Sequence, residues 1–198
     1  LIPAFKNAGA QLHTIVTANG TNSTLQGKKF GFARASTDAG EVFKDPDLNT
    51  LVIATQHNTH AQYAIDGLNA NLNVWVEKPL AIDKDSLELI EAAYFKAHEK
   101  AKNNHNGPQL MVGFNRRFAP QVKKMHRLLS SLNSPKTVII TVNAGHIPQD
   151  HWTQDSLVGG GRIIGEGCHF IDLMRFLVGK KIISVNGRAM FLNSSKSI

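Results

Sequence analysis

The chain has 198 residues, of which 42% are hydrophobic and 19% are charged, a composition typical of a globular protein and not of a disordered one. Its 22 Lys and Arg exceed its 15 Asp and Glu by seven, but acids are interspersed and aromatic residues for base stacking are few, which argues against nucleic-acid binding. A single cysteine excludes an internal disulfide and fits a cytoplasmic protein, and no run approaches the roughly 20 apolar residues of a membrane span.

The first half of the sequence alternates strands and helices. Four apolar runs predict the strands: residues 12–17, 50–55, 73–77 and 109–115. Their nearly unbroken hydrophobicity is typical of parallel strands that are covered on both faces. Helical spacing predicts a helix over residues 58–70 and a second one that opens at Asp85, with Glu88 completing a capping box. Repeated strand-helix-strand units predict a doubly wound parallel sheet.

The pattern changes after residue 115, and we place a domain boundary there, between residues 1–115 and 116–198. The second part carries four predicted elements: a helix over 120–131, a strand over 137–142, a helix that stops at Gly179 and a strand over 182–192. A loop at residues 156–161 precedes the second of these helices.

Polar side chains follow the second predicted strand, where the next helix begins. Ligands of an open parallel sheet lie beyond the carboxyl ends of its strands. Thr55, His57 and His60 therefore stand where a ribose, an amide or a phosphate would bind. Simple capping of the helix by Asn58 or Thr59 explains the same polarity equally well.

A lysine follows the third predicted strand, in the sequence Glu77-Lys78-Pro79. The proline restricts the backbone beside Lys78. A rigid ammonium group in a cleft polarises a hydroxyl, or stabilises the alkoxide that forms as hydride leaves. The alternative is a lysine at a strand end that reaches solvent.

A glycine-rich segment, Gly159-Gly160-Gly161, precedes a histidine, His169. In a continuous helix Asp172 shares a face with His169, so the carboxylate would orient the imidazole or share its site. His169 suits a general base near neutral pH, although a capping or packing role is the alternative. The glycines match neither G-x-G-x-x-G nor a phosphate-binding G-K-[ST] loop, and the histidines form no metal-ligand pattern, so we expect no metal.

Four ordered motifs together resemble the Gfo/Idh/MocA oxidoreductase family: residues 55–60, 77–79, 113–118 and 159–172. The resemblance implies a Rossmann-type domain for NAD or NADP, followed by an α/β domain with an open, largely antiparallel sheet. That second domain would bind a sugar or polyol and contribute to a homo-oligomer. The family's first strand and glycine-rich turn would stand before Leu1, and its second domain would continue past Ile198, so the chain is expected to be truncated.

The resemblance also implies roles for individual residues. Lys78 would lie near the reacting hydroxyl, and His169 would accept its proton. The residues expected to border the cofactor are Thr55, His57, His60, Glu77 and Lys78. Those expected near the substrate are Arg116, Arg117, Glu166 and Asp172.

Two positions depart from the family pattern. Many relatives carry an aspartate where this chain has Gly165, and the carboxylate here is one position later, at Glu166. One step along a regular helix turns a side chain by about 100°, so Glu166 replaces that acid only if the local turn is irregular. Residues 18–20 also lack the acidic residue that would bind the NAD ribose, which leaves NAD and NADP both open.

The sequence therefore predicts an NAD(P)-dependent oxidoreductase that transfers hydride at a secondary alcohol of a sugar, a polyol or a sugar derivative. Two alternatives stay open: an NAD-assisted glycoside-cleaving enzyme of the same family, and a non-catalytic dinucleotide-binding regulator.

Overall fold

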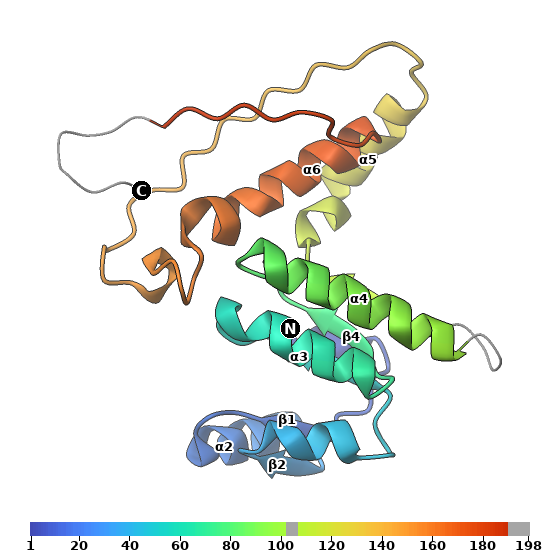
Figure 1. Ribbon diagram of the computed structural model, residues 1–198, viewed down its shortest axis with the longest axis vertical. Coiled ribbons are helices and arrows are strands. Elements are labelled where there is room, and N and C mark those ends of the chain that lie inside the picture. The colour runs from blue at the N-terminus through green and yellow to red at the C-terminus, as the bar shows by residue number, and fades with distance from the viewer. Residues whose placement is uncertain (102–106, 190–198) are drawn as a thin grey trace.

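A computed structural model describes residues 1–101 and 107–189 of the chain (Figure 1). Within these residues, strands β1 (Thr14–Val16) and β2 (Arg34–Ser36) form a parallel pair. Strands β3 (Thr50–Ile53), β4 (Asn73–Val76) and β5 (Leu110–Val112) form a second parallel sheet in the order β3-β4-β5. The predicted parallel strands are confirmed, each somewhat shorter than the apolar run that predicted it.

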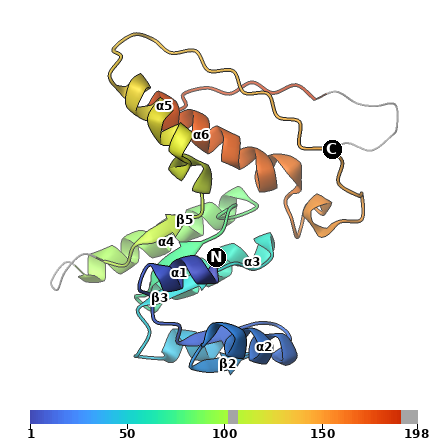
Figure 2. The same ribbon diagram turned by 180° about the vertical axis from the view of Figure 1, so that it is seen from behind.

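Helix α1 (Ile2–Asn7) precedes β1. Helix α2 (Gly20–Phe30) connects β1 to β2, α3 (His57–Asn69) connects β3 to β4, and α4 (Lys84–Ala101) lies between β4 and β5. Figure 1 shows α3 and α4 on one face of the three-stranded sheet, and Figure 2 shows α1 on its other face. Helix α2 packs against the β1-β2 pair. Helices α3 and α4 thus cover one face of the three-stranded sheet. Helix α1 covers only part of the other face, where Val52 and Met111 are 40% and 45% exposed.

The core lies between β4 and the two helices α3 and α4. Val74 and Val76 point into it and are almost completely buried, together with Leu68 and Ile90. Trp75, between the two valines, has the opposite orientation, and its ring meets that of Phe5 from α1 edge to face at 5.5 Å. Because successive side chains of β4 point to opposite sides, this strand contributes to the packing on both faces of the sheet.

A glycine brings α3 close to the sheet. A Cβ atom at Gly67 would lie 2.9 Å from side-chain atoms of both Leu51 and Val74. Any larger residue would push α3 away from β3, which it follows, and from β4, which it precedes.

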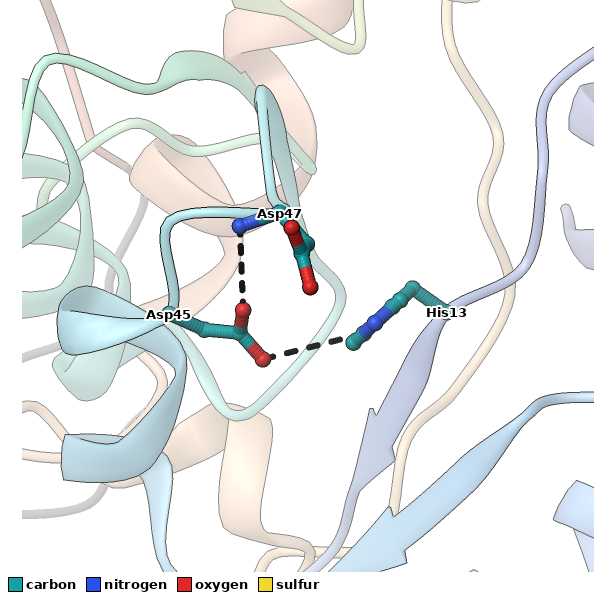
Figure 3. A group of neighbouring side chains, drawn as sticks. All are labelled: His13, Asp45 and Asp47. Atoms are coloured by element: carbon teal, nitrogen blue, oxygen red, sulfur yellow. Dashed lines mark hydrogen bonds and ion pairs between the residues drawn. The ribbon is translucent and has the colours of Figure 1, made fainter.

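The carboxylate of Asp45 lies beside the N-terminal ends of β1 and β2. Asp45 directly follows the 3₁₀ helix η1 (Ala39–Lys44). Figure 3 shows Asp45 beside His13 and Asp47, with 3.9 Å between Asp45 Oδ2 and His13 Nδ1. Ligand atoms of the three residues lie within 4.8 Å of one another, as in a metal site. However, Arg34 Nη1 lies 3.1 Å from the same Asp45 oxygen, and its positive charge opposes a second cation there. We interpret the group as a salt bridge that ties β1 and β2 to the loop before β3.

Helix α4 begins at Lys84, one residue before Asp85, which opens the predicted capping box. The carboxylate of Asp83, not Asp85, accepts hydrogen bonds from the Ser86 amide at 2.7 Å and from the Ser86 hydroxyl at 2.8 Å. These bonds lower the pKa of Asp83. The prediction of Asp85 as the cap is therefore wrong, because an equally suitable aspartate stands two positions before it.

Beyond β5 the chain passes through η2 (Asn115–Phe118) into α5 (Pro120–Ser130), which lies beside α6 (Cys168–Val178) in both views (Figures 1 and 2). Two irregular turns precede α6: η3 (Trp152–Gln154) and the π-helical η4 (Ile163–Gly167). Gly179, with a φ of 71°, ends α6 where the sequence predicted its stop. The boundary between residues 115 and 116 coincides with the start of η2 and stays a prediction.

Two predicted strands of the second part do not form in the described residues. Residues 137–142 and 182–189 are extended without a strand ladder, and residues 190–192 lie outside the described part. Ile139 and Ile183 are 87% and 96% exposed. A strand requires a hydrogen-bonded neighbour, and within residues 1–101 and 107–189 neither segment has one, so the predicted antiparallel sheet is not seen.

Across the described ranges, none of the helices combines the length and the apolar character needed to cross a membrane.

Candidate functional site

Lys78 lies directly after β4, and its side chain is only 18% exposed. Its Nζ donates a hydrogen bond to the carbonyl oxygen of Gly165 at 2.7 Å. The carboxylate of Glu166 lies 3.8 Å from the same nitrogen. The side chain of Lys78 therefore points toward Gly165 and Glu166 instead of extending into solvent.

The turn that carries Gly165 and Glu166 is irregular. Residues Ile163–Gly167 are π-helical, and such a turn holds more residues than an α-helical one and changes the direction of its side chains. Glu166 consequently lies between two cations, 3.8 Å from Lys78 Nζ and 3.4 Å from Arg116 Nη2. The irregular turn that Glu166 needs in order to replace an acid at position 165 is present.

Position 165 itself leaves little room for a side chain. A Cβ atom there would lie 3.1 Å from Cε1 of His57 and 3.3 Å from the carbonyl oxygen of Gly159. An aspartate would also place its charge against that carbonyl oxygen. His57 thus fills the space that a carboxylate at position 165 would need, and the acid stands at Glu166.

His169 is buried near the start of α6, 7% exposed, and its ring meets that of Phe114 edge to face at 6.3 Å. Burial lowers the pKa of His169, and the positive charges of Lys78 and Arg116 lower it further, against a smaller opposing effect of Glu166. Its Nδ1 atom is buried without a hydrogen-bond partner in the described part of the chain. The result is a neutral imidazole with a free ring nitrogen, which is the state a general base needs.

Asp172 does not orient His169, contrary to the prediction. Its buried carboxylate accepts two hydrogen bonds from Arg117, one of them from Nε at 2.6 Å and the other from Nη2. These bonds raise the pKa of Arg117. Although residues three apart share a helix face, the guanidinium offers two parallel donors, and a buried carboxylate is better stabilised by that fork than by a neutral ring. The pair holds α6 against η2, and thereby holds the backbone of His169.

His57 and His60 were expected to border the cofactor, but both rings are buried and bonded to backbone carbonyls. His57 Nδ1 bonds Gly159 O at 2.8 Å, and the nitrogens of the fully buried His60 bond Pro79 O at 2.7 Å and Thr55 O at 3.1 Å. Burial lowers the pKa of His57. The two histidines position the segments around Lys78. Both ring nitrogens of His60 are engaged, whereas His57 bonds through Nδ1 alone within the described residues, so its expected contact with the cofactor stays a prediction.

Thr55 and Glu77 stand at the carboxyl ends of β3 and β4, as predicted. The Thr55 hydroxyl is exposed and lies 2.6 Å from that of Thr59. Glu77 is half-buried, with Oε2 accepting the amide of Lys78 at 3.3 Å. A Cβ at Gly113 would lie 3.1 Å from this oxygen, so a glycine is needed beside it.

Three residues near the site were not singled out from the sequence. Trp152 packs its ring edge to face on His57 at 4.8 Å, and Phe114 covers one side of His169. Cys168 is half-buried, and burial raises the pKa of its thiol. No local pattern marks the two aromatic residues, because their partners lie far away in the sequence.

Comparison with known proteins places this arrangement in a family. Residues 1–107 match the family described as "Oxidoreductase family, NAD-binding Rossmann fold". The scyllo-inositol 2-dehydrogenase (NAD(+)) of Bacillus subtilis strain 168 is 30% identical over 84% of this chain and 46% of its own length. Levoglucosan dehydrogenase of Pseudarthrobacter phenanthrenivorans is 29% identical over 84% of this chain and 42% of its own length.

The fold comparison agrees. A solved structure of levoglucosan dehydrogenase in complex with NADH and levoglucosan matches with a TM-score of 0.66 at 24% identity, covering 85% of this chain and 45% of that one. The chain spans less than half the length of these relatives. Because the family match covers more than half of the chain, the chain belongs to the Gfo/Idh/MocA oxidoreductase family, with its NAD-binding Rossmann fold.

Proposed function

We propose that this chain contributes the nicotinamide-binding and proton-transfer groups of a dehydrogenase that oxidises a secondary alcohol of a sugar, a polyol or a sugar derivative. The observation that carries the proposal is the pairing of a half-buried ammonium group, Lys78, with a neutral histidine, His169, whose Nδ1 lacks a partner in the described part of the chain. The charge of Lys78 acts directly on the pKa of His169, so the two groups share one site.

The residues present fit the nicotinamide end of NAD or NADP. A buried nitrogen without a partner indicates a polar group that joins the site from outside the chain. Thr55 and Glu77, at the carboxyl ends of neighbouring parallel strands, would hold the cofactor beside Lys78. When bound, the cofactor supplies the acceptor for the hydride. The names of the relatives support NAD, and the lack of an acidic residue at positions 18–20 only removes the usual sequence argument for NAD over NADP.

Lys78 prepares the substrate hydroxyl. An ammonium group has three donors, and here one is used by the Gly165 carbonyl and one faces Glu166. The remaining donor is available to the substrate oxygen, where the positive charge stabilises the developing alkoxide.

His169 accepts the hydroxyl proton. The acceptor is an unprotonated ring nitrogen of His169, since no hydrogen bond within the described residues occupies the Nδ1 atom and the imidazole is free to take the proton. Its lowered pKa keeps it unprotonated near neutral pH and therefore ready to act.

Glu166 directs specificity toward polyhydroxylated substrates. Its carboxylate has acceptor capacity beyond its contacts with Lys78 and Arg116, and it lies beside the atom that would hold the reacting hydroxyl. A neighbouring hydroxyl of a sugar or cyclitol would donate to it. Simple alcohols lack that second group and would bind more weakly.

The test is a turnover assay with the whole protein that contains this chain. NAD⁺ or NADP⁺ would be mixed with a panel of cyclitols, anhydrosugars and simple secondary alcohols, and nicotinamide absorbance followed together with product analysis. We expect net cofactor reduction with at least one polyhydroxylated compound. Sugar release without net reduction would overturn the proposal in favour of glycoside cleavage, and cofactor binding without turnover would favour a regulator.

The predicted cytoplasmic location and homo-oligomeric state stay proposals that rest on the single cysteine and on the family resemblance, respectively.

A further inference from the structure

A second concave site lies at the opposite end of α6 from His169. A cavity of about 350 Å³ opens there, between α5, η2 and the chain that follows α6. Phe176 lines it together with five basic residues: Arg117, His126, Arg175, Lys180 and Lys181. Its lining contains no acidic side chain.

The charge of this basic pocket is only partly compensated. Arg117 is neutralised by Asp172, but Arg175, Lys180 and Lys181 form no ion pair within the described residues. The C-terminal end of α6 carries roughly half a unit of negative charge, which a single cation would neutralise. Among the described residues more than two positive charges are left over, so the helix dipole alone does not explain the cluster.

One wall of the pocket is rigid and flat. The rings of His126 and Phe176 stack at 4.2 Å with an angle of 17°, and the guanidinium of Arg117 lies over Phe176 at 5.5 Å. Arg117 is also fixed from behind by its two bonds to Asp172. These contacts order one side of the pocket, and Lys180 and Lys181 line it from the chain that follows α6.

The donors on this surface define the ligand. Arginine and lysine donate and do not accept, so the ligand must offer several acceptor atoms and negative charge. A phosphate monoester dianion has both, and a pocket of this volume stands at the lower end of the range for small-molecule sites. We propose that the basic pocket binds a small phosphorylated ligand, at a position separate from the site of Lys78 and His169.

The test is isothermal titration of the protein with glucose 6-phosphate and with inorganic phosphate, at constant ionic strength and without a nicotinamide cofactor. We expect both probes to bind. Replacing Lys180 and Lys181 by Gln, or Arg175 by Gln, should weaken binding at least tenfold. A matched control changes Lys28 and Lys29 on α2 to Gln, which removes the same charge elsewhere and should alter the dissociation constant less than twofold.

Three outcomes would overturn the proposal: no binding to the unchanged protein, equal weakening in the Lys28 and Lys29 control, or binding of DNA or anionic vesicles through these residues without binding of either phosphate probe. Circular dichroism of each variant establishes that it is folded before titration. Since the titration involves neither cofactor nor turnover, its failure would leave the proposed dehydrogenase activity untouched, and the reverse also holds.

Discussion

The ammonium nitrogen of Lys78 lies 2.7 Å from the carbonyl oxygen of Gly165, a residue 87 positions further along the chain. This bond joins the end of a central strand to a π-helical turn and fixes the distance between the two parts of the site. It also orients the ammonium group of Lys78 toward the carboxylate of Glu166.

Replacing Lys78 by Met should lower kcat/KM for alcohol oxidation by about 10² to 10³, the usual effect of removing a donor that stabilises a developing oxyanion. Steady-state rates of nicotinamide reduction measure this. Lys84→Met is the matched control, because Lys84 is 84% exposed on α4 and pairs with the exposed Glu88. Equal activity of the two variants would exclude Lys78 from the chemistry.

The pH profile of kcat/KM should report His169. A base must be unprotonated, so the rate should fall as the pH drops through the pKa of His169, which burial and the charges of Lys78 and Arg116 hold below its ordinary value of 6.5. Glu166 raises this pKa, so Glu166→Gln should move the acid limb to lower pH.

Arg116→Gln should move the same limb to higher pH, because Arg116 lowers the pKa of His169. Shifts of the same sign in the two variants, or a limb that neither moves, would show that another group titrates. The paired variants therefore separate a role of His169 from a general loss of activity.

Replacing Asp172 by Ala should destabilise the fold by about 2 kcal/mol, the scale of hydrogen bonds to a charged group, because Arg117 is partly exposed and regains water. Urea unfolding measures the change. The exposed Lys84–Glu88 pair provides the comparison, since Glu88→Ala should cost less than about 1 kcal/mol. If Asp172→Ala were as mild as Glu88→Ala, the ion pair would not hold α6 in place.

Gly165→Ala should destabilise the protein by about 1–3 kcal/mol through overpacking, since the new methyl group would press on His57 and on the Gly159 carbonyl. It should also lower activity, because the carbonyl that receives Lys78 would shift. Gly187→Ala is the control, with no atom within 4 Å of the added Cβ. Thermal unfolding and turnover of the two variants should differ clearly; if they coincide, position 165 has room for a side chain.

Much of this fold follows from local patterns, and the site follows only in part. The apolar run before Thr55 predicted a covered parallel strand, and Gly179 predicted the end of α6, since both depend on neighbours in the sequence. Lys78 and His169 are close enough for their charges to interact, but the sequence offered no sign that Arg117 would take Asp172 away from His169. That pairing depends on a contact between segments 55 residues apart.

The two missing strands have a related cause. The β-branched residues around Ile139 have the right character for a strand, yet strand formation is a property of a pair, and the described chain supplies no partner. Local sequence therefore indicates that a segment can form a strand, but it does not indicate which other strand would pair with it.

The bonds that unite the site share one property: Lys78, His57 and His60 all bind backbone carbonyl oxygens. A substitution changes a side chain but leaves the peptide oxygen of that residue in place. Ile163 and Ile164, which are 73% and 37% exposed, are therefore free to diverge without detaching the segment from the sheet. The acceptor oxygens belong to Gly159 and Gly165, so the exposed side chains between these two glycines can change while the proton-transfer groups keep their positions.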